Sequence, residues 1–227
     1  MLLDAVGTLI ALREPVGESY ARIAAAHGVR IGAWRLEEAF RRVHTAAPPL
    51  AFPDASSAEV PARERAAWRE LARRTFLSAD SAQRFDDFDA CFDALWRHFA
   101  APEAWALRDG AAAALAVLRA SGRRAAVVSN FDHRLPPILA GLGVANLLDA
   151  VVLPGDAGAA KPDPRIFRCA LARLGAAPGE AAFVGDDRER DLEAARALGL
   201  RAIDVASLAT LEEIPDRIEA LEGGGEP

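Results

Sequence analysis

The chain has 227 residues, of which 52% are hydrophobic, and its 27 basic and 33 acidic side chains give a net charge of −6. This balance offers no broad basic surface for nucleic acid or for an anionic membrane, and no apolar run approaches the roughly 18 residues that a membrane-spanning helix needs. The two cysteines, Cys91 and Cys169, lack zinc-binding or CxxC spacing, which favours free thiols in a reducing compartment. Because no signal-peptide pattern opens the sequence, we expect a cytoplasmic protein.

The first residues, Met1–Leu3, predict a short buried strand that ends at Asp4 and is followed by a glycine–threonine turn. From about Glu14 to Trp105 the pattern changes, because apolar and aromatic residues recur at helical spacing and no strand pattern is evident. Four helices are predicted in this region, over Glu18–His27, Arg35–Thr45, Ala58–Leu77 and Arg84–Phe99.

Strands and helices alternate from residue 110 onward, which indicates a parallel sheet with crossover helices. The predicted strands are the short apolar runs Arg124–Val128, Ala150–Leu153, Ala181–Val184 and Arg201–Val205. The predicted helices are Gly110–Ser121, Arg134–Leu142, Pro164–Leu174, Arg188–Leu198 and Leu211–Leu221. We therefore expect an α/β core domain of residues 1–13 and 106–227, interrupted by an all-helical domain of residues 14–105. The proline-bearing connections Leu12–Pro15 and Ala100–Leu107 are the predicted hinges.

Polar residues come directly after or near the end of three predicted strands, and a fourth polar motif lies in a loop. They are Asp4, Ser129-Asn130, Lys161-Pro162 and Asp186-Asp187. Because the carboxyl ends of parallel strands meet at one edge of a sheet, we expect these groups to converge there. A carboxylate, a hydroxyl, an ammonium group and a pair of acids suit phosphoryl transfer through an aspartyl intermediate. Lys161 is also the only lysine in the sequence, which favours a functional role for it.

The order of these four motifs, with a helical insert after the first, resembles the haloacid dehalogenase superfamily and its helical-cap subfamily. The stretches Asp4–Leu9 and Arg13–Gly17 resemble the branch described as REG-2-like or haloacid dehalogenase-like hydrolase domain-containing protein 3-like. The resemblance covers nearly the whole chain. It implies a Rossmann-like three-layer α/β/α core with a parallel sheet, and an all-helical cap over the C-terminal strand ends whose movement controls access to the site.

The resemblance also implies a role for each motif residue. Asp4 would be the nucleophile that forms an aspartyl phosphate, and Ser129 and Lys161 would assist it by contacting the phosphoryl oxygens. The residues implied to bind the substrate are Gly7, Thr8 and Asn130, the last through its main-chain N–H.

The implied cofactor is Mg²⁺, which prefers oxygen ligands. Its ligands would be the carboxylates of Asp4 and Asp186 and the main-chain carbonyl oxygen of Val6. Asp187 or Asp191 would act through a water molecule, although each could instead be an acidic residue that complements the start of a helix.

One position departs from the pattern of the superfamily's phosphatases, which carry a second aspartate two residues after the nucleophile. Val6 occupies that position here, and it can neither protonate a leaving group nor activate water. Such acid–base assistance is commonly worth roughly 10²–10⁴ in rate. Asp132, His133 and His44 are conceivable substitutes.

Three functions remain open at this point. The leading prediction is a Mg²⁺-dependent phosphatase that acts on a small phosphorylated metabolite. Val6 motivates a second one, a catalytically weak or inactive regulatory protein that binds phosphate and Mg²⁺. A 2-haloacid dehalogenase is third, because the acid pair Asp186-Asp187 favours metal and phosphate over halide. We expect no nucleic-acid or membrane partner, and a monomer or homodimer.

Overall fold

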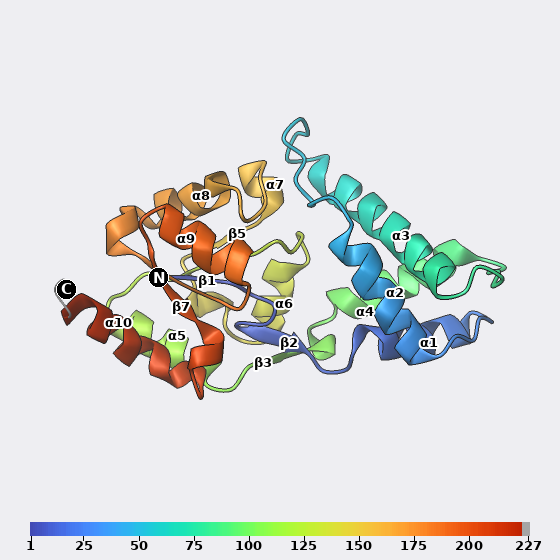
Figure 1. Ribbon diagram of the computed structural model, residues 1–227, viewed down its shortest axis with the longest axis horizontal. Coiled ribbons are helices and arrows are strands. Elements are labelled where there is room, and N and C mark those ends of the chain that lie inside the picture. Colours follow the sequence, from blue (N-terminus) through green and yellow to red (C-terminus); the bar gives the residue numbers. More distant parts are fainter. Residues whose placement is uncertain (224–227) are drawn as a thin grey trace.

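The computed structural model describes residues 1–223 and shows a helix-flanked sheet with a group of helices beside it (Figure 1). The strands of the sheet are β1 (Leu2–Leu3), β4 (Ala126–Val128), β5 (Ala150–Val152), β6 (Ala182–Gly185) and β7 (Arg201–Asp204). Their order is β5-β4-β1-β6-β7, and every neighbouring pair is parallel. The predicted α/β fold is therefore confirmed, and the two-residue strand β1 lies at the centre of the sheet.

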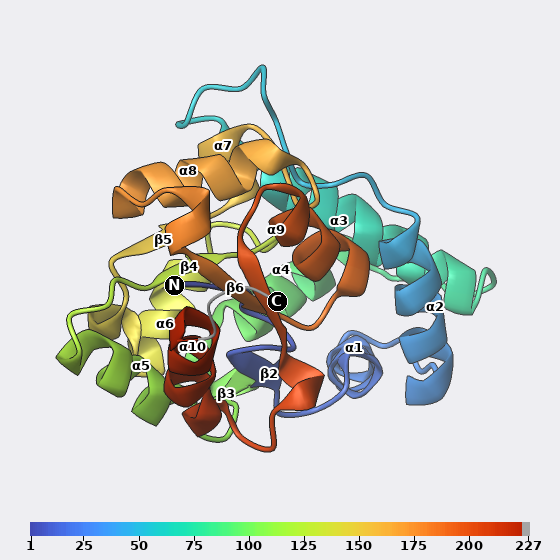
Figure 2. The same ribbon diagram turned by 60° about the vertical axis from the view of Figure 1, so that its left-hand side comes forward.

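Helices cover both faces of this sheet, which gives three layers (Figures 1 and 2). One face carries α5 (Ala111–Ala120), α6 (Leu135–Gly141) and α10 (Ile214–Gly223), and the other carries α7 (Pro154–Ala157), α8 (Pro164–Leu174) and α9 (Ala194–Ala197). Short 3-10 turns lie at Pro102–Ala104, Ala145–Leu147, Pro178–Glu180, Val205–Ser207 and Leu211–Glu213.

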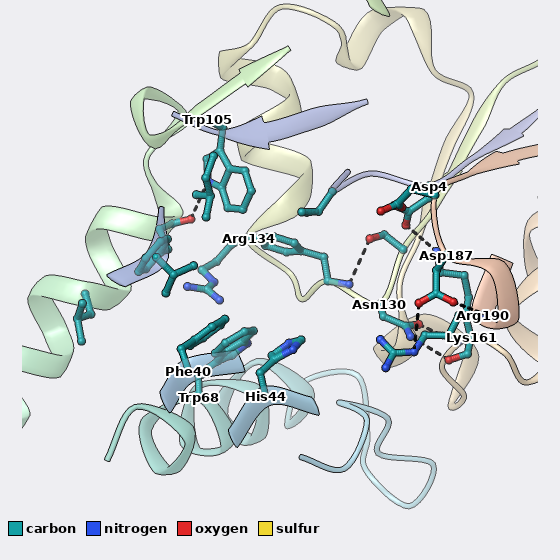
Figure 3. Close-up of a pocket in the computed structure, with 18 of the residues that line it drawn as sticks. Asp4, Phe40, His44, Trp68, Trp105, Asn130, Arg134, Lys161, Asp187 and Arg190 are labelled. Carbon is teal, nitrogen blue, oxygen red and sulfur yellow. Dashed lines mark hydrogen bonds and ion pairs between the residues drawn. The ribbon is translucent and has the colours of Figure 1, made fainter. Parts of the chain in front are cut away.

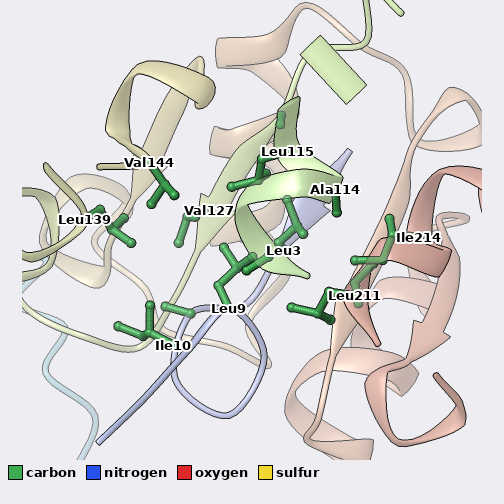
Figure 4. Close-up of a cluster of buried hydrophobic side chains, with 14 of the residues drawn as sticks. Leu3, Leu9, Ile10, Ala114, Leu115, Val127, Leu139, Val144, Leu211 and Ile214 are labelled. Atoms are coloured by element: carbon green, nitrogen blue, oxygen red, sulfur yellow. The ribbon is translucent and has the colours of Figure 1, made fainter. Parts of the chain in front are cut away.

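The strands are apolar throughout because both of their faces are buried. Successive side chains of a strand point to opposite faces. Leu3 and Val127 accordingly pack with Leu115 of α5 (Figure 4), whereas their neighbour Leu2 packs with Phe167 of α8. This burial holds the strand ends rigidly, and the main-chain N–H of Asp4 extends the pairing by donating to the carbonyl of Val184 at 2.9 Å. The carboxylate of Asp4 thus emerges at a fixed point of the sheet edge.

The helices between the first and second strands of the sheet have a hydrophobic core of their own. They are α1 (Val16–Ala26), α2 (Ala33–Thr45), α3 (Val60–Ala79) and α4 (Phe88–Ala100). Tyr20, Leu36, Phe76 and Phe92 are among the buried residues that join them. We call these four helices the helical unit; α4 also contacts α6 of the sheet layers. The division into domains at residues 13/14 and 105/106 stays a prediction, and residues 224–227 of its second segment lie outside the described part of the chain.

The connections to the helical unit contain strands that the sequence did not predict, and their role as hinges stays a prediction. β2 (Ile10–Leu12) and β3 (Trp105–Leu107) form a two-stranded antiparallel sheet, with Ile10 opposite Leu107 and Leu12 opposite Trp105. Both strands are only three residues long, too short for an alternating pattern to be recognised in the sequence. The chain therefore leaves the sheet layers and returns to them through paired strands.

The predicted helix Arg188–Leu198 is also not uniform. A π-helical turn over Arg188–Glu193 precedes α9, and the N–H groups of Asp191 and Leu192 both donate to the carbonyl of Asp187, at 3.0 and 3.2 Å. π-Helical turns occur frequently at functional sites. Within residues 1–223, no helix combines the length and apolar character that crossing a membrane would require.

Candidate active site

The predicted motif residues meet at the carboxyl edge of the sheet (Figure 3). Asp4 follows β1, Ser129 follows β4 and Asp186 follows β6, which are three adjacent strands. Lys161 reaches this edge from the loop between α7 and α8, and its Nζ donates a hydrogen bond to Oδ1 of Asp4 at 2.6 Å. The same Nζ lies 2.6 Å from Oδ1 of Asp191. Residues far apart in the sequence thus form one compact group.

Asn130 holds the loop that carries Lys161. Its side-chain Nδ2 donates to the carbonyl of Lys161 at 2.9 Å, and its Oδ1 accepts from the N–H of Lys161 at 2.7 Å. The amide side chain is therefore occupied by the lysine's main chain, which fixes the starting point of the Lys161 side chain. Ser129 lies beside it, buried, with its Oγ accepting from the N–H of Phe131 at 3.3 Å.

Burial and charge together set the protonation of the group. Burial raises the pKa of Asp4 to about 6, and the nearby Asp191 adds to this rise while Lys161 opposes it. Burial also raises the pKa of Asp191, again against the effect of Lys161. Burial lowers the pKa of Lys161, but the two carboxylates outweigh it, so that the net direction is upward. Lys161 is therefore a permanent cation between two acids.

The acidic residues of the group fit a divalent cation. Carboxylate oxygens of Asp4, Asp186 and Asp191 lie within 4.8 Å of one another. Oδ1 of Asp191 is buried and accepts no hydrogen bond of acceptable geometry from residues 1–223, despite its closeness to Lys161. Three carboxylates face one ammonium group, and clustered carboxylates repel unless a cation or proton offsets them. Hard oxygen ligands of this kind are those that Mg²⁺ prefers.

Gly7 and Thr8 support Asp186 rather than line the cavity at the site. Gly7 has φ of +91°, and a Cβ on it would lie 2.3 Å from Oδ2 of Asp186. Thr8 is fully buried, and its hydroxyl donates to Oδ1 of Asp186 at 3.4 Å. The packed turn thus directs the hydroxyl of Thr8 to the carboxylate of Asp186, and the expected contact of Thr8 with a substrate stays a prediction.

Asp187 lies outside the group of three carboxylates. Its Oδ1 accepts from the N–H groups of Glu189 and Arg190, at 3.0 and 2.8 Å, and so caps the π-helical turn. This is the alternative role left open by the sequence. Asp191, one turn later and buried, is the residue that reaches Lys161.

A family model described as haloacid dehalogenase-like hydrolase matches residues 1–199. The chain is a member of the haloacid dehalogenase-like hydrolase family. It is 38% identical to the mouse (Mus musculus) haloacid dehalogenase-like hydrolase domain-containing protein 3 over 209 residues, which cover 92% of this chain and 82% of the relative. The predicted superfamily and branch are thereby confirmed.

Two further proteins show how far the likeness extends. A phosphoserine phosphatase of Thermus thermophilus is 39% identical over 92 residues, which cover 39% of this chain and 37% of the relative. The crystal structure of a HAD phosphatase from Thermococcus onnurineus superposes with a TM-score of 0.65 at 21% identity, covering 99% of this chain and 97% of that one. The second likeness concerns the fold alone.

Val6 occupies the position at which the resemblance implies an aspartate in phosphatases. Its side chain is 38% exposed and lines the cavity at the site. Two of the three conceivable substitutes for an aspartate there are engaged elsewhere. Asp132 is fully buried in an ion pair with Arg134, at 2.6 Å, and Nδ1 of His133 contacts the carboxylate of Glu64.

His44 is the substitute that does line the cavity. Its ring stacks with Phe40 and Trp68, at centroid distances of 5.3 and 6.0 Å. Desolvation, with the nearby charge of Arg190, lowers the pKa of His44 below its ordinary value. The imidazole is therefore neutral near pH 7 and is a poor proton donor for a leaving group.

The cavity joins the sheet edge to the helical unit and has a volume of about 350 Å³. Asp4, Ser129 and Lys161 form one end of it. The other end is lined mainly by aromatic side chains, which are Tyr20, Phe40, Trp68, Phe92, Trp96, Phe99, Trp105 and Phe131. The sequence did not identify these residues as a binding wall, since aromatic residues at helical spacing have the same pattern as a helix core. Arg134 was also missed, and its guanidinium lies 3.8 Å from the centroid of Trp96.

Proposed function

We propose that this hydrolase is a Mg²⁺-dependent phosphatase that acts on a small phosphorylated molecule through an aspartyl phosphate at Asp4. The single observation that carries the proposal is the group of three carboxylates that surrounds the contact between Lys161 and Asp4. A phosphoryl group suits this arrangement. The carboxylate of Asp4 can attack its phosphorus, while the ammonium group of Lys161 offsets the negative charge of its oxygens.

Each residue has a defined part in this reaction. The carboxylate of Asp4 attacks phosphorus, and the bond to the leaving oxygen breaks as the acyl phosphate forms. Lys161 offsets negative charge on the carboxylate and the phosphoryl oxygens, and the hydroxyl of Ser129 is available to donate to one of those oxygens. Mg²⁺, held by Asp4, Asp186 and Asp191, would supply charge stabilisation for the phosphoryl group. The partial likeness to a phosphoserine phosphatase supports the same reaction class.

The test is phosphate release from para-nitrophenyl phosphate with and without Mg²⁺. We expect turnover by the wild type that requires Mg²⁺ and is lost, by roughly 10³-fold or more, in Asp4→Asn, because the variant removes the carboxylate that attacks phosphorus. Asp216→Asn removes an exposed acid from α10 and serves as the control with unchanged turnover. Turnover that survives Asp4→Asn would contradict the proposal.

Val6 supports a second candidate, a protein that binds phosphate and Mg²⁺ at this site without useful turnover. It predicts an inactive wild type that gains phosphatase activity in Val6→Asp, since the variant places a carboxylate in the cavity. Release of chloride from 2-chloropropionate without metal would instead favour a dehalogenase. Action in the cytoplasm, and a monomeric or homodimeric state, stay predictions.

A further inference from the structure

The cavity gives information about the part of the substrate that is not phosphate. Beyond Val6 its wall consists mainly of flat rings, with a few aliphatic side chains among them. Phe40, His44 and Trp68 of the helical unit stack in a row, while Trp105 lies across from them (Figure 3). Aromatic walls of this kind favour a ring that can stack on them or meet them edge to face. The volume of about 350 Å³ lies within the range of roughly 300–1,000 Å³ typical of small-molecule sites.

The charges of the cavity wall argue against a second anionic group on the substrate. Arg134 is paired with Asp132 at 2.6 Å and is covered by the ring of Trp96. Arg190 lies 3.7 Å from the carboxylate of Asp187. Each lysine or arginine that lines the cavity within residues 1–223 therefore has a carboxylate nearby. An uncharged organic group fits this wall better than a carboxylate or a second phosphate, which would compete with those pairs.

Two polar groups of the wall are available to a ligand, Nε1 of Trp68, which is buried without a hydrogen-bond partner among residues 1–223, and the hydroxyl of Tyr20. Tyr20 is buried and lines the cavity, and its hydroxyl makes no hydrogen bond with the described residues, 1–223. Burial raises the pKa of the Tyr20 hydroxyl, so it keeps its proton and can donate a hydrogen bond but is a weak acid. A ring with an oxygen or nitrogen acceptor would find a donor there.

Apart from the acidic residues at the sheet edge, the cavity wall formed by residues 1–223 offers the leaving oxygen no suitable acid. The side chain beside the nucleophile that faces the cavity is Val6, while His44 is neutral and Tyr20 holds its proton tightly. The oxygen must therefore depart as an anion. A phenol resembles the tyrosine side chain, with a pKa of about 10, whereas an alcohol is closer to water, with a pKa of about 15.7. A phenoxide leaves without a proton far more readily than an alkoxide.

We propose that the substrates are aryl phosphate monoesters, in which the phosphoryl oxygen is bonded directly to an aromatic ring. This inference rests on the proposed phosphatase function. The Asp4 carboxylate forms a bond to phosphorus while the bond between phosphorus and the aryl oxygen breaks, and the electron pair leaves with that oxygen, which takes a proton from solvent. Water then attacks the phosphorus of the acyl phosphate, releasing phosphate and restoring the carboxylate, with its proton passing to solvent.

The decisive comparison is phenyl phosphate against benzyl phosphate, which presents the same ring but an alkoxide leaving group. We expect kcat for phenyl phosphate to be at least about a hundredfold higher, in line with the value of a missing general acid. Val6→Asp should narrow that ratio by raising turnover of the benzyl ester. Equal rates for the two esters, or a preference for glycerol 2-phosphate, would overturn the inference.

The aromatic wall is tested separately. Phe40→Leu keeps bulk but removes a ring, and should raise KM for phenyl phosphate roughly two- to tenfold. Trp34→Ala is the matched control, since Trp34 lies on the same helix, is 69% exposed and does not line the cavity. As a measurement independent of any variant, phenylphosphonate should inhibit the wild type about tenfold more tightly than methylphosphonate. Similar inhibition by the two phosphonates would contradict an aromatic site.

These outcomes separate the inference from the proposed function. Asp4-dependent phosphate release from alkyl esters without preference for aryl esters would leave the phosphatase proposal standing and refute the aryl inference. No phosphate release from any ester by the wild type or by Val6→Asp would refute both.

Discussion

At the scale of single residues, the site depends on small side chains as much as on charged ones. Gly7 and Gly185 face the carboxylates of Asp186 and Asp191 so closely that a Cβ on either would come within 2.4 Å of a carboxylate oxygen. The three acids can gather only because these two positions lack a side chain. The resemblance implied that Gly7 binds the substrate, but the sequence did not show that its neighbour is Asp186, since only the folded sheet edge places β1 beside β6.

Gly7→Ala should therefore lower the free energy of unfolding by more than backbone strain alone would. Its φ of +91° alone costs an alanine roughly 1–2 kcal/mol, and displacement of the Asp186 carboxylate adds to this and disrupts the acidic group. Gly28→Ala is the control, because Gly28 has φ of +82° and nothing within 4 Å of the added Cβ. Chemical unfolding should show the larger loss of stability for Gly7→Ala, with phosphatase activity lost only in that variant. Equal losses of stability would show that Asp186 is not held where we describe it.

At the scale of elements, the parallel sheet and its helices could be predicted because their sequences carry strong patterns. Each buried strand is a continuous apolar run, and the main helices have a period of 3.6 residues. The π-helical turn Arg188–Glu193 could not be predicted, since it depends on which carbonyl each N–H selects rather than on hydrophobic spacing. The pairing of β2 with β3 joins segments more than 90 residues apart, so neither short strand has a local signal of its own.

Mutation can distinguish the two roles suggested for Asp187, which are to act on the metal through a water molecule and to cap the π-helical turn. Asp187→Ala removes a cap and should cost about 1 kcal/mol, a fall in Tm of roughly 2–4 °C for a chain of this size. Mg²⁺ should still raise its Tm as much as it raises that of the wild type. Asp191→Asn should instead lose most of the Mg²⁺ effect, because Asp191 belongs to the carboxylate group. Scanning calorimetry with Mg²⁺ or with a chelator measures both, and loss of the Mg²⁺ effect in Asp187→Ala would identify Asp187 as a ligand.

At the scale of the whole molecule, the helical unit and the sheet layers meet through buried polar contacts as well as through the cavity. Glu64 of α3 is buried and contacts the ring and the main-chain N–H of His133, which precedes α6. Next to it, the guanidinium of Arg134 lies over Trp68 of α3 and Trp96 of α4. These contacts could not be predicted from the sequence. The partners of His133 and Arg134 lie far away along the chain, in α3 and α4, and come close only after the helical unit has folded.

The contact at Glu64 should make stability depend on pH. Burial raises the pKa of Glu64 above its ordinary value of 4.5, more than its hydrogen bonds with His133 lower it. Over the range between the unfolded and the folded pKa, the folded protein holds a proton that the unfolded chain has lost, so stability falls as pH rises through this range. Glu64→Gln cannot titrate. We therefore expect the Tm of Glu64→Gln to rise relative to that of the wild type as pH rises from about 4 to 7.

The exposed Glu219→Gln on α10 provides the control and should show no such trend. A difference between Glu64→Gln and the wild type that is the same at every pH would mean that the carboxyl group of Glu64 titrates alike in the folded and unfolded states.

The pairing of β2 with β3 has one further consequence. Hydrogen-bonded strands lie about 5 Å apart, so the chain enters and leaves the helical unit at nearly the same point. A segment attached in this way can be exchanged for another of different size without displacing the strand that presents Asp4. Selection can therefore change the aromatic wall of the cavity while Asp4 and Lys161 remain in place.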